Sequence, residues 1–464
     1  MNILFASSEV YPFSKTGGLA DVAGSLPNAL GELGHRVLIV TPRYRGIKLK
    51  AKKLSPNVEV VFVKNEHYFD RGGIYGGPKG DYADNLKRFT FFCHEVLDIA
   101  KKKNFVPDIV HSNDWHTGLI NTLLKTEYKE DSFFKNTRSL FTIHNLAYQG
   151  IFEMDEFSQV VSADKSVLEH MEFYGRASLM RAGLEFADAI STVSPTYAKE
   201  IRTKEHGCGL ENILQRRKKD LYGILNGIDH IVWNPKTDKA LKNNGNIHLA
   251  KYRADNRSAL RAKAKLKPDG DPPIFGIVTR LAEQKGLDLI CETFEDLMSR
   301  GIQFVLLGTG DARYESFFKK ITKKYKGQIG VWLKFSEISS SLIYGGCDYF
   351  LMPSRFEPCG LGQMISFRYG AIPLVRSTGG LADTVIDMQA DTTSNNGFVF
   401  KKYESKAFLG AVDRAIQTYG HKSKLSLVRK NGKKCDFSWN HSAKEYERIY
   451  RKILNNKVRC TPLV

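Results

Sequence analysis

The stretches KTGGLADV (Lys15–Val22) and STGGLADT (Ser377–Thr384) share six consecutive residues, TGGLAD. Each copy follows a short apolar run typical of a buried strand and opens a run with helical spacing of apolar residues. Ligands of parallel sheets bind where such turns lie, at the carboxyl ends of the strands. Paired glycines let the backbone adopt positive φ and approach a ligand, while a helix N-terminus offers N–H groups to an anion. The repeat therefore predicts two ligand-binding turns, and only the first carries a lysine, Lys15. Their glycines are Gly17, Gly18, Gly379 and Gly380.

The rest of the chain alternates strand and helix patterns on both sides of a polar segment at about 235–273, where we expect a linker. Helical spacing is clearest at 19–34 and 286–300. This alternation predicts an α/β protein with two Rossmann-like, doubly wound domains in tandem. Brief runs that are apolar on both faces, as buried parallel strands are, lie at 2–7, 35–42, 108–114, 139–145, 189–194, 221–227, 274–281, 303–310, 329–335, 348–354 and 372–377.

Length and composition exclude several classes of protein. A chain of 464 residues with 42% hydrophobic side chains can bury two cores. No apolar run approaches the roughly 18–20 residues that span a bilayer, and the first fifteen residues have the pattern of a first strand rather than of a signal peptide. Seven scattered cysteines without a C-x-x-C pair argue against disulfide scaffolds and zinc clusters. We therefore expect a cytoplasmic protein without a membrane partner.

The formal charge of +19 comes from short lysine and arginine clusters spread over the whole chain. These clusters contain no interleaved aromatic pattern and no nucleic-acid-binding module. Solvated faces with a general preference for anionic ligands explain this distribution better than specific nucleic-acid binding does.

The second half carries charged side chains at predicted strand ends. Arg280 and Lys285 follow one strand, and two cations there suit a diphosphate with roughly two to three negative charges. Glu357 lies in FEPCGLGQ after another strand; it either complements a helix dipole or accepts hydrogen bonds from sugar or ribose hydroxyls. Neither a P-loop nor a G-x-G-x-x-G fingerprint is present, which argues against P-loop hydrolysis and classical dinucleotide binding.

Two other chemistries can be weighed from the residues alone. His111, Asp114, His116 and His144 could form a metal cluster, but their spacing matches no helical H-x-x-x-H arrangement, so we favour hydrogen bonding or sugar binding. Cys359 could be a nucleophile, but the sequence offers no evident base, so we favour a small packing residue in a turn.

The chain resembles bacterial glycogen synthases and plastid starch synthases from Met1 to about Tyr450. The motifs that carry the resemblance occur in the family's order and include SKTGGLADV, HSNDWHTGL, FTIHNLAYQGIF, VTRLAEQKGLDL, MPSRFEPCGLGQ and PLVRSTGGLADTV. The resemblance implies the GT-B fold, with two Rossmann-like domains over a deep cleft. It also implies transfer of glucose from ADP-glucose to the non-reducing end of an α-1,4-glucan, with retained anomeric configuration. We expect domains at 1–240 and 241–440, and a C-terminal helix at 441–464 that crosses back to the first domain.

The resemblance also implies roles for residues of the first domain. Lys15 matches the lysine that reaches the donor phosphates. His144 and Asn145 match residues beneath the anomeric carbon, and Asp114 matches an aspartate that orients the sugar or acceptor. Tyr75 corresponds to an acceptor-side tyrosine. We count Gly17 and Gly18 among the ligand-binding residues.

In the second domain, Arg280 and Lys285 match the pair that neutralises the diphosphate leaving group. Glu357 matches the glutamate that holds hydroxyls of the transferred glucose, and Gly379 and Gly380 match the loop that meets phosphates and sugar. Fixed cations and amides can stabilise the leaving group electrostatically, so we expect no cofactor and no metal. The EPCG turn and the second loop add the predicted ligand-binding residues Cys359, Gly360 and Thr378.

The chain departs from the family pattern at two places. Ile365 and Ser366 stand where an aromatic residue and glycine are common. Phe335-Ser336-Glu337 stands where Tyr-His-Glu is expected, so Phe335 can stack on the base but offers no hydroxyl. Two alternatives therefore remain: a GT-B enzyme that uses another donor such as UDP-glucose, and an inactive glucan-binding scaffold. The oligomeric state is not predicted.

Overall fold

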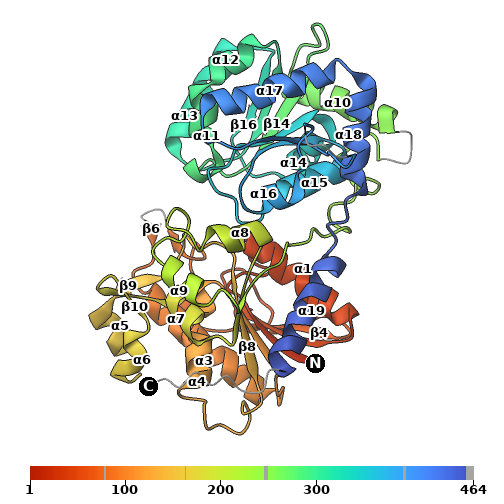
Figure 1. Cartoon of the computed structure of the whole chain (residues 1–464). Coiled ribbons are helices and arrows are strands. Elements are labelled where there is room, and N and C mark those ends of the chain that lie inside the picture. The colour runs from red at the N-terminus through yellow and green to blue at the C-terminus, as the bar shows by residue number, and fades with distance from the viewer. Residues whose placement is uncertain (78–79, 162, 245–248, 390–392, 456–464) are drawn as a thin grey trace. The chain divides into compact units, whose positions relative to one another are not determined.

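The computed structural model describes residues 1–77, 80–161, 163–244, 249–389 and 393–455. By its internal contacts the chain divides into two compact units, and Figure 1 labels many of their elements. Unit 1 contains Met1–Gly227 and the segment that begins at Ser438, and unit 2 contains Ile228–Phe437. Of the last predicted segment, 441–464, the structure describes residues 441–455. Cys460 lies outside the described residues.

Unit 1 is built on an eight-stranded sheet in the order β13-β12-β8-β7-β1-β2-β4-β3. All neighbouring strands are parallel except β3 and β4. The strands are β1 (Asn2–Ala6), β2 (Arg36–Pro42), β3 (Ala51–Ser55), β4 (Val58–Val63), β7 (Ile109–Asn113), β8 (Arg138–Ile143), β12 (Ala189–Thr192) and β13 (Leu221–Gly223). Small antiparallel sheets pair β5 (Gly76–Gly77) with β6 (Gly80–Asp81), and join β9 (Ile151–Glu153), β11 (Arg176–Ser178) and β10 (Glu172–Phe173).

Helices cover both faces of this sheet (Figure 1). On one face α1 (Gly18–Glu32) packs against α19 (Trp439–Asn455), and on the other α3 (Asn85–Lys102) and α7 (Leu179–Phe186) pack against α4 (Leu119–Lys125). Trp439, Tyr446 and Tyr450 of α19 are buried in the core beside β1 and β2. The other helices of unit 1 are α2 (Glu66–Phe69), η1 (Trp115–Thr117), α5 (Met154–Val160), α6 (Lys165–Glu169), α8 (Pro195–Glu200) and α9 (Glu211–Arg216).

Unit 2 is built on a six-stranded parallel sheet in the order β16-β15-β14-β17-β18-β19. Its strands are β14 (Ile274–Val278), β15 (Gln303–Leu307), β16 (Ile329–Trp332), β17 (Tyr349–Met352), β18 (Ile372–Arg376) and β19 (Phe398–Phe400). Its helices are α10 (Leu249–Ala264), η2 (Glu283–Lys285), α11 (Leu287–Glu292), α12 (Phe294–Ser299), α13 (Ala312–Lys324), α14 (Glu337–Gly346), α15 (Gly362–Tyr369), α16 (Gly379–Thr384), α17 (Ser405–Tyr419) and α18 (Lys422–Lys434).

The prediction of a linker at 235–273 is wrong, because the helix α10 lies within this segment. Tyr252, Asn256 and Leu260 of α10 are buried, and the helix packs against α14. The two units divide near residue 228 rather than at 240, since the segment after Ile228 packs on unit 2. There the ring of Trp233 contacts that of Tyr369.

Among the described residues, no helix is both long enough and apolar enough to cross a membrane. The cytoplasmic location expected from the sequence remains a prediction.

Candidate functional site

The predicted site residues fall into two groups, one in each unit, and several residues of each group follow the strands at which the sheet reverses strand order. In unit 1 this point lies between β1 and β7, and in unit 2 between β14 and β17. Loops that leave the carboxyl ends of such strand pairs diverge to opposite faces of the sheet, which leaves a crevice where ligands bind. The topology therefore favours the positions that the sequence predicted.

Asp114 and His144 come together at the carboxyl ends of β7 and β8. The Asp114 carboxylate accepts hydrogen bonds from the backbone N–H groups of His144 (2.7 Å) and Asn145 (3.4 Å). Asp114 has a φ of 57°, a conformation that costs free energy for a residue with a Cβ and that clusters at functional sites. Burial raises the pKa of Asp114 to about 7. The side chain thus holds the backbone that presents His144 and Asn145.

The His144 ring is buried and neutral. Burial lowers the pKa of His144 to about 3, so its imidazole carries no charge at neutral pH. Its Nε2 lies 2.9 Å from Oδ1 of Asn113, the last residue of β7. The sequence analysis missed Asn113, because the contact joins two strands 31 residues apart.

The first TGGLAD turn is held by Glu9, a second residue that the sequence analysis missed. The buried Glu9 carboxylate accepts hydrogen bonds from the Thr16 backbone N–H, the Thr16 hydroxyl (2.5 Å) and the Gly17 N–H (3.2 Å). Those two amides are therefore already bonded within the protein. The only signal in the sequence was an acidic residue three positions after a strand.

Tyr75 joins the same network. Its hydroxyl donates to Glu9 (2.6 Å), and its ring stacks on that of His116 at a centroid distance of 4.5 Å. Burial and the Glu9 charge raise the pKa of Tyr75 well above its ordinary value. Glu9 therefore connects the predicted phosphate-binding turn with the predicted acceptor-side tyrosine.

The Lys15 ammonium is solvent-accessible and paired. Its Nζ lies 2.6 Å from Asp21, the last residue of the first TGGLAD copy, and 5.2 Å from the centre of the Tyr11 ring. Because about a third of the lysine side chain is exposed, water screens this pair, and it contributes little to stability. Lys15 can therefore exchange Asp21 for an anionic ligand at small cost.

In unit 2, Lys285 and Glu357 meet where the strand order reverses. Lys285 Nζ lies 2.9 Å and 2.7 Å from the two carboxylate oxygens of Glu357, which also accepts the Ser354 hydroxyl at 2.9 Å. Glu357 is 5% exposed. The sequence predicted both residues separately, and the structure places them in direct contact.

Arg280 and Phe335 are exposed at the ends of β14 and β16. Phe335 is 77% exposed, so a face of its ring is open to a planar ligand. The Arg280 guanidinium makes no ion pair with any residue that the structure describes. Both side chains are therefore open to solvent at the same edge of the sheet.

The second TGGLAD turn packs tightly on the EPCG turn. A Cβ at Gly379 would collide with the carbonyl oxygen of Glu357, and one at Gly380 would collide with that of Cys359. Gly379 has a φ of 45°. The Gly380 N–H donates to the carbonyl oxygens of Glu357 (3.2 Å) and Pro358 (3.1 Å). These glycines are required by the packing of the protein itself.

The first copy differs in this respect. A Cβ at Gly17 or Gly18 would meet no atom within 4 Å, and Gly17 is extended, with a φ of −150°. The positive φ expected of the paired glycines occurs in the second copy, at Gly379, and not at Gly17 or Gly18. Neither packing nor a positive φ therefore requires glycine at Gly17 or Gly18.

The remaining predicted residues of unit 2 shape the EPCG turn. Cys359 is buried, Gly360 has a φ of 73°, and the Gln363 side chain donates to both of their carbonyl oxygens, at 3.1 Å and 3.0 Å. Thr378 is 1% exposed and precedes α16. Burial of Cys359 favours the packing role over that of a nucleophile.

Among the described residues, no group of three or more His, Cys, Asp and Glu side chains is arranged to hold a metal ion. His111 is one of the four residues considered as metal ligands. Its two ring nitrogens form hydrogen bonds with the hydroxyl groups of Tyr450 (2.7 Å) and Thr142 (2.6 Å). The expectation that no metal or cofactor is needed stays a prediction.

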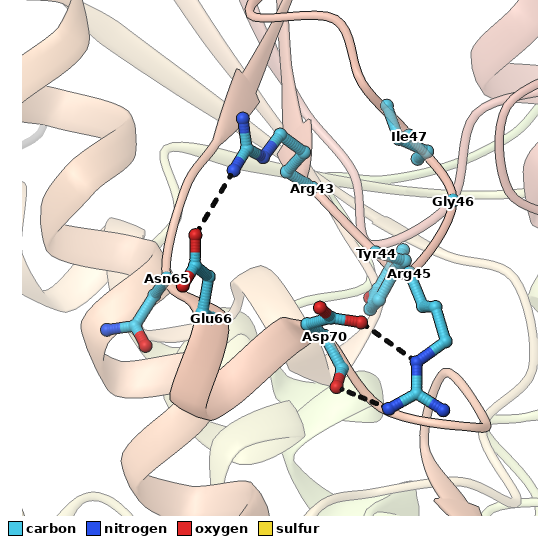
Figure 2. A pocket seen from close by; sticks show the side chains of 8 residues that line it. All are labelled: Arg43, Tyr44, Arg45, Gly46, Ile47, Asn65, Glu66 and Asp70. Carbon is cyan, nitrogen blue, oxygen red and sulfur yellow. Dashed lines mark hydrogen bonds and ion pairs between the residues drawn. The ribbon is translucent and has the colours of Figure 1, made fainter.

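Figure 2 shows a separate small pocket after β2 and β4. Its two arginines are opposed by carboxylates, with Arg43 3.9 Å from Glu66 and Arg45 2.8 Å from Asp70. These pairs offset the positive charge, so the pocket has no net preference for an anion. None of the predicted site residues lines it; the lining residues are Arg43, Tyr44, Arg45, Gly46, Ile47, Asn65, Glu66 and Asp70.

Comparison with known proteins gives consistent matches over the whole chain. The family model of the starch synthase catalytic domain matches residues 2–216, and that of glycosyl transferases group 1 matches residues 259–435. A glycogen synthase of Geotalea uraniireducens is 43% identical over 484 residues, covering 99% of this chain and 100% of that protein. One of Thermotoga petrophila is 41% identical over 486 residues, covering 98% and 99%.

Solved structures agree. The catalytic domain of starch synthase IV from Arabidopsis thaliana, bound to ADP and acarbose, has a TM-score of 0.89 and 33% identity, and the match covers 98% of this chain and 99% of that one. A sucrose-phosphate synthase from Thermosynechococcus elongatus has a TM-score of 0.63 at 18% identity, with 98% and 100% covered. The second similarity concerns the fold alone.

Proposed function

Because this chain belongs to the glycogen and starch synthase family of hexosyltransferases, we propose that it transfers glucose from ADP-glucose to the non-reducing end of an α-1,4-glucan. The GT-B fold and the glycosyltransferase class that the sequence predicted are confirmed. The donor base, the retained anomeric configuration and the roles of individual residues belong to the proposal.

The Lys285–Glu357 pair is the observation that carries the proposal. Glucose bound to a diphosphate presents hydroxyl donors beside a cluster of negative charge. A buried carboxylate can accept hydroxyl hydrogen bonds, and an ammonium beside it can bind phosphate oxygens. In this structure both groups lie at the carboxyl ends of β14 and β17, 2.7 Å apart. We therefore assign Glu357 to the hydroxyl groups of the sugar and Lys285 to the phosphate oxygens of the leaving group.

Cations supply the chemistry that the reaction needs. When the bond between glucose and diphosphate breaks, negative charge grows on the leaving group. Cations that are already held in position stabilise this charge well, because they do not have to move during the reaction. Lys285 is already fixed by Glu357, and Arg280 is unpaired within the described part of the chain. We assign both to the diphosphate, and in unit 1 we assign Lys15 to phosphate binding.

The acceptor side is assigned to unit 1. Tyr75, held by Glu9, presents polar and aromatic surface to the acceptor, whereas His144 and Asn145, whose backbone Asp114 holds, are assigned to the anomeric carbon of the donor glucose. Sugars bind to such combinations of hydrogen-bonding groups and aromatic faces. The departing phosphate would take the proton of the acceptor hydroxyl, so no second carboxylate is needed in the manner of a glycosidase.

The test follows oligosaccharide elongation with ADP-glucose and an α-1,4-linked primer, and identifies the new linkage by proton NMR. Glu357→Ala and Lys285→Ala should each lower the rate at least about 100-fold, the scale of lost electrostatic stabilisation. Lys324→Ala, which removes a surface lysine paired with Glu295 at the end of α13, is the matched control and should keep full activity. A β-linked product, or full activity of Glu357→Ala, would contradict the assignment.

A further inference from the structure

We propose that Asn113 is a positioning residue that fixes the tautomer of His144, so that Nδ1 of the ring accepts a hydrogen bond from a hydroxyl of the bound sugar. The part that concerns sugar rests on the function proposed above. The part that concerns the tautomer rests on the hydrogen bonds of unit 1 alone.

The orientation of the Asn113 amide is determined by backbone carbonyls. Its Nδ2 donates to the carbonyl oxygen of Ala6 at 3.0 Å and lies 3.4 Å from that of His111. A carbonyl oxygen can only accept, so the NH2 group must face these two atoms. The amide oxygen must then face the His144 ring, from which it is separated by 2.9 Å.

An amide oxygen also can only accept, so the ring nitrogen opposite it must carry the proton. That nitrogen is Nε2. A neutral imidazole has one N–H, which leaves Nδ1 with a lone pair. The ring is neutral because burial lowers the pKa of His144 to about 3.

Both partners are held rigidly. Asn113 is fully buried, and its backbone N–H and carbonyl both bond to the Thr117 hydroxyl, at 2.5 Å and 2.9 Å. The backbone N–H of His144 bonds to the Asp114 carboxylate. The backbones of both residues are therefore fixed, and a flip of the Asn113 amide would place its oxygen against the carbonyl oxygens of Ala6 and His111.

Nδ1 of His144 has no hydrogen-bonding partner among the residues that the structure describes. At this edge of the unit 1 sheet, Nδ1 can accept a hydrogen bond from a donor but cannot donate one. A sugar hydroxyl is such a donor, whereas a phosphate or carboxylate oxygen is not. The geometry therefore selects a hydroxyl at this position and excludes anionic groups.

The tautomer is measurable without substrate. Histidine labelled with 15N reports which ring nitrogen carries the proton, and His144→Ala identifies the signals of His144. The wild type should show only the Nε2–H form at neutral pH, with an Nε2 proton that exchanges slowly with water. Asn113→Leu, which removes the acceptor and keeps the volume, should show a second tautomer and fast exchange of that proton.

Kinetics test the role in binding sugar. Asn113→Leu should lower kcat/KM for ADP-glucose about tenfold or more, the scale of a misplaced buried hydrogen bond. Inhibition by ADP, which contains no glucose, should be unchanged. Asn121→Leu is the matched control, because Asn121 is equally buried in the same unit but its amide bonds to Ser112 and Gly118. Asn121→Leu should leave the 15N spectrum of His144 unaltered. It should also leave unaltered the ratio of kcat/KM for ADP-glucose to the affinity for ADP.

A wild-type ring protonated on Nδ1, or a mixture of tautomers, would overturn the proposal, and this result does not depend on any variant folding. Equal losses of ADP affinity and kcat/KM in Asn113→Leu would indicate general damage and would also overturn it. A wild type with the Nε2–H ring that uses no sugar nucleotide would refute the proposed function and leave the tautomer assignment standing.

Discussion

The two copies of TGGLAD allow a sharp prediction, because identical glycines lie in different surroundings. Gly18→Ala adds a methyl group where no atom lies within 4 Å, at the first residue of α1. Gly380→Ala adds the same group into the carbonyl of Cys359. The first change should leave the fold intact and impair the reaction, whereas the second should destabilise unit 2.

The magnitudes follow from these surroundings. Replacing glycine by alanine at a compatible backbone conformation stabilises by about 0.4–1 kcal/mol, through the unfolded chain. Gly18→Ala should therefore be as stable as the wild type or slightly more. Overpacking costs about 1–3 kcal/mol, and Gly380→Ala should lose at least that, since the obstructing atoms are backbone.

Enzymatic activity shows whether a ligand approaches Gly18 or whether glycine at this position has no role in binding. If a ligand approaches the first turn closely, the methyl group displaces it by about an ångström, and a displacement of that size can cost about 100-fold in rate. Gly18→Ala should thus combine wild-type stability with a large loss of kcat/KM for ADP-glucose.

Calorimetric unfolding and initial rates of ADP release measure the two effects. Gly410→Ala is the matched control, because Gly410 lies in the helix α17 with open space above it and is not a predicted site residue. It should gain stability and keep full activity. Full activity of Gly18→Ala would refute ligand approach at the first turn, and a Gly380→Ala protein as stable as Gly410→Ala would refute the packing argument.

Three further changes test the charges and hydrogen bonds of the two units. Lys285→Ala leaves the buried carboxylate of Glu357 unpaired and should destabilise unit 2 by about 3–5 kcal/mol; the double variant with Glu357→Gln should lose clearly less than the sum in urea unfolding, and additive losses would contradict the pairing. Because burial raises the pKa of Asp114 from 3.8 to about 7, the folded state binds a proton that the unfolded chain releases. Wild-type stability should therefore fall as pH rises from about 4 to about 7, by up to about 1.4 kcal/mol per pH unit, relative to Asp114→Asn; parallel pH profiles of the two proteins would show that Asp114 does not titrate there. Tyr450→Phe removes the hydroxyl 2.7 Å from His111 Nδ1 and should lower the melting temperature of unit 1 by the equivalent of about 1 kcal/mol; an unchanged melting temperature would count against that bond.

Much of the fold was predictable because buried parallel strands are apolar on both faces and short, as at β1 and β14. The strands β3, β4 and β19 were missed. Strand β19 has only three residues, too few for a periodic pattern, and β3 is polar and largely exposed. The polar sequence of α10 concealed a helix, since its buried side includes Tyr252, Arg253 and Asn256, which carry polar groups. Composition alone could not distinguish that helix from a linker.

Candidate site residues could be selected from the sequence where their chemistry stands at a strand end, as for Lys285 and Glu357, which the structure places in contact. Glu9 and Asn113 were missed because their roles depend on partners that the sequence does not show. Asn113 meets Ala6 only when β1 and β7, more than a hundred residues apart, become neighbours in the sheet. The two TGGLAD copies show that identical residues can lie in different surroundings. The glycines of the second copy are packed against backbone atoms, and those of the first copy are not.

We propose ADP-glucose as the donor for elongation of an α-1,4-glucan. The most direct measurement compares initial rates of glucose incorporation into an α-1,4-linked oligosaccharide from ADP-glucose and from UDP-glucose, at equal concentrations. We expect kcat/KM for ADP-glucose to exceed that for UDP-glucose by at least about tenfold, a difference of roughly 1.4 kcal/mol in transition-state binding. Faster transfer from UDP-glucose, or no transfer from either donor by a protein that still binds glucan, would contradict it.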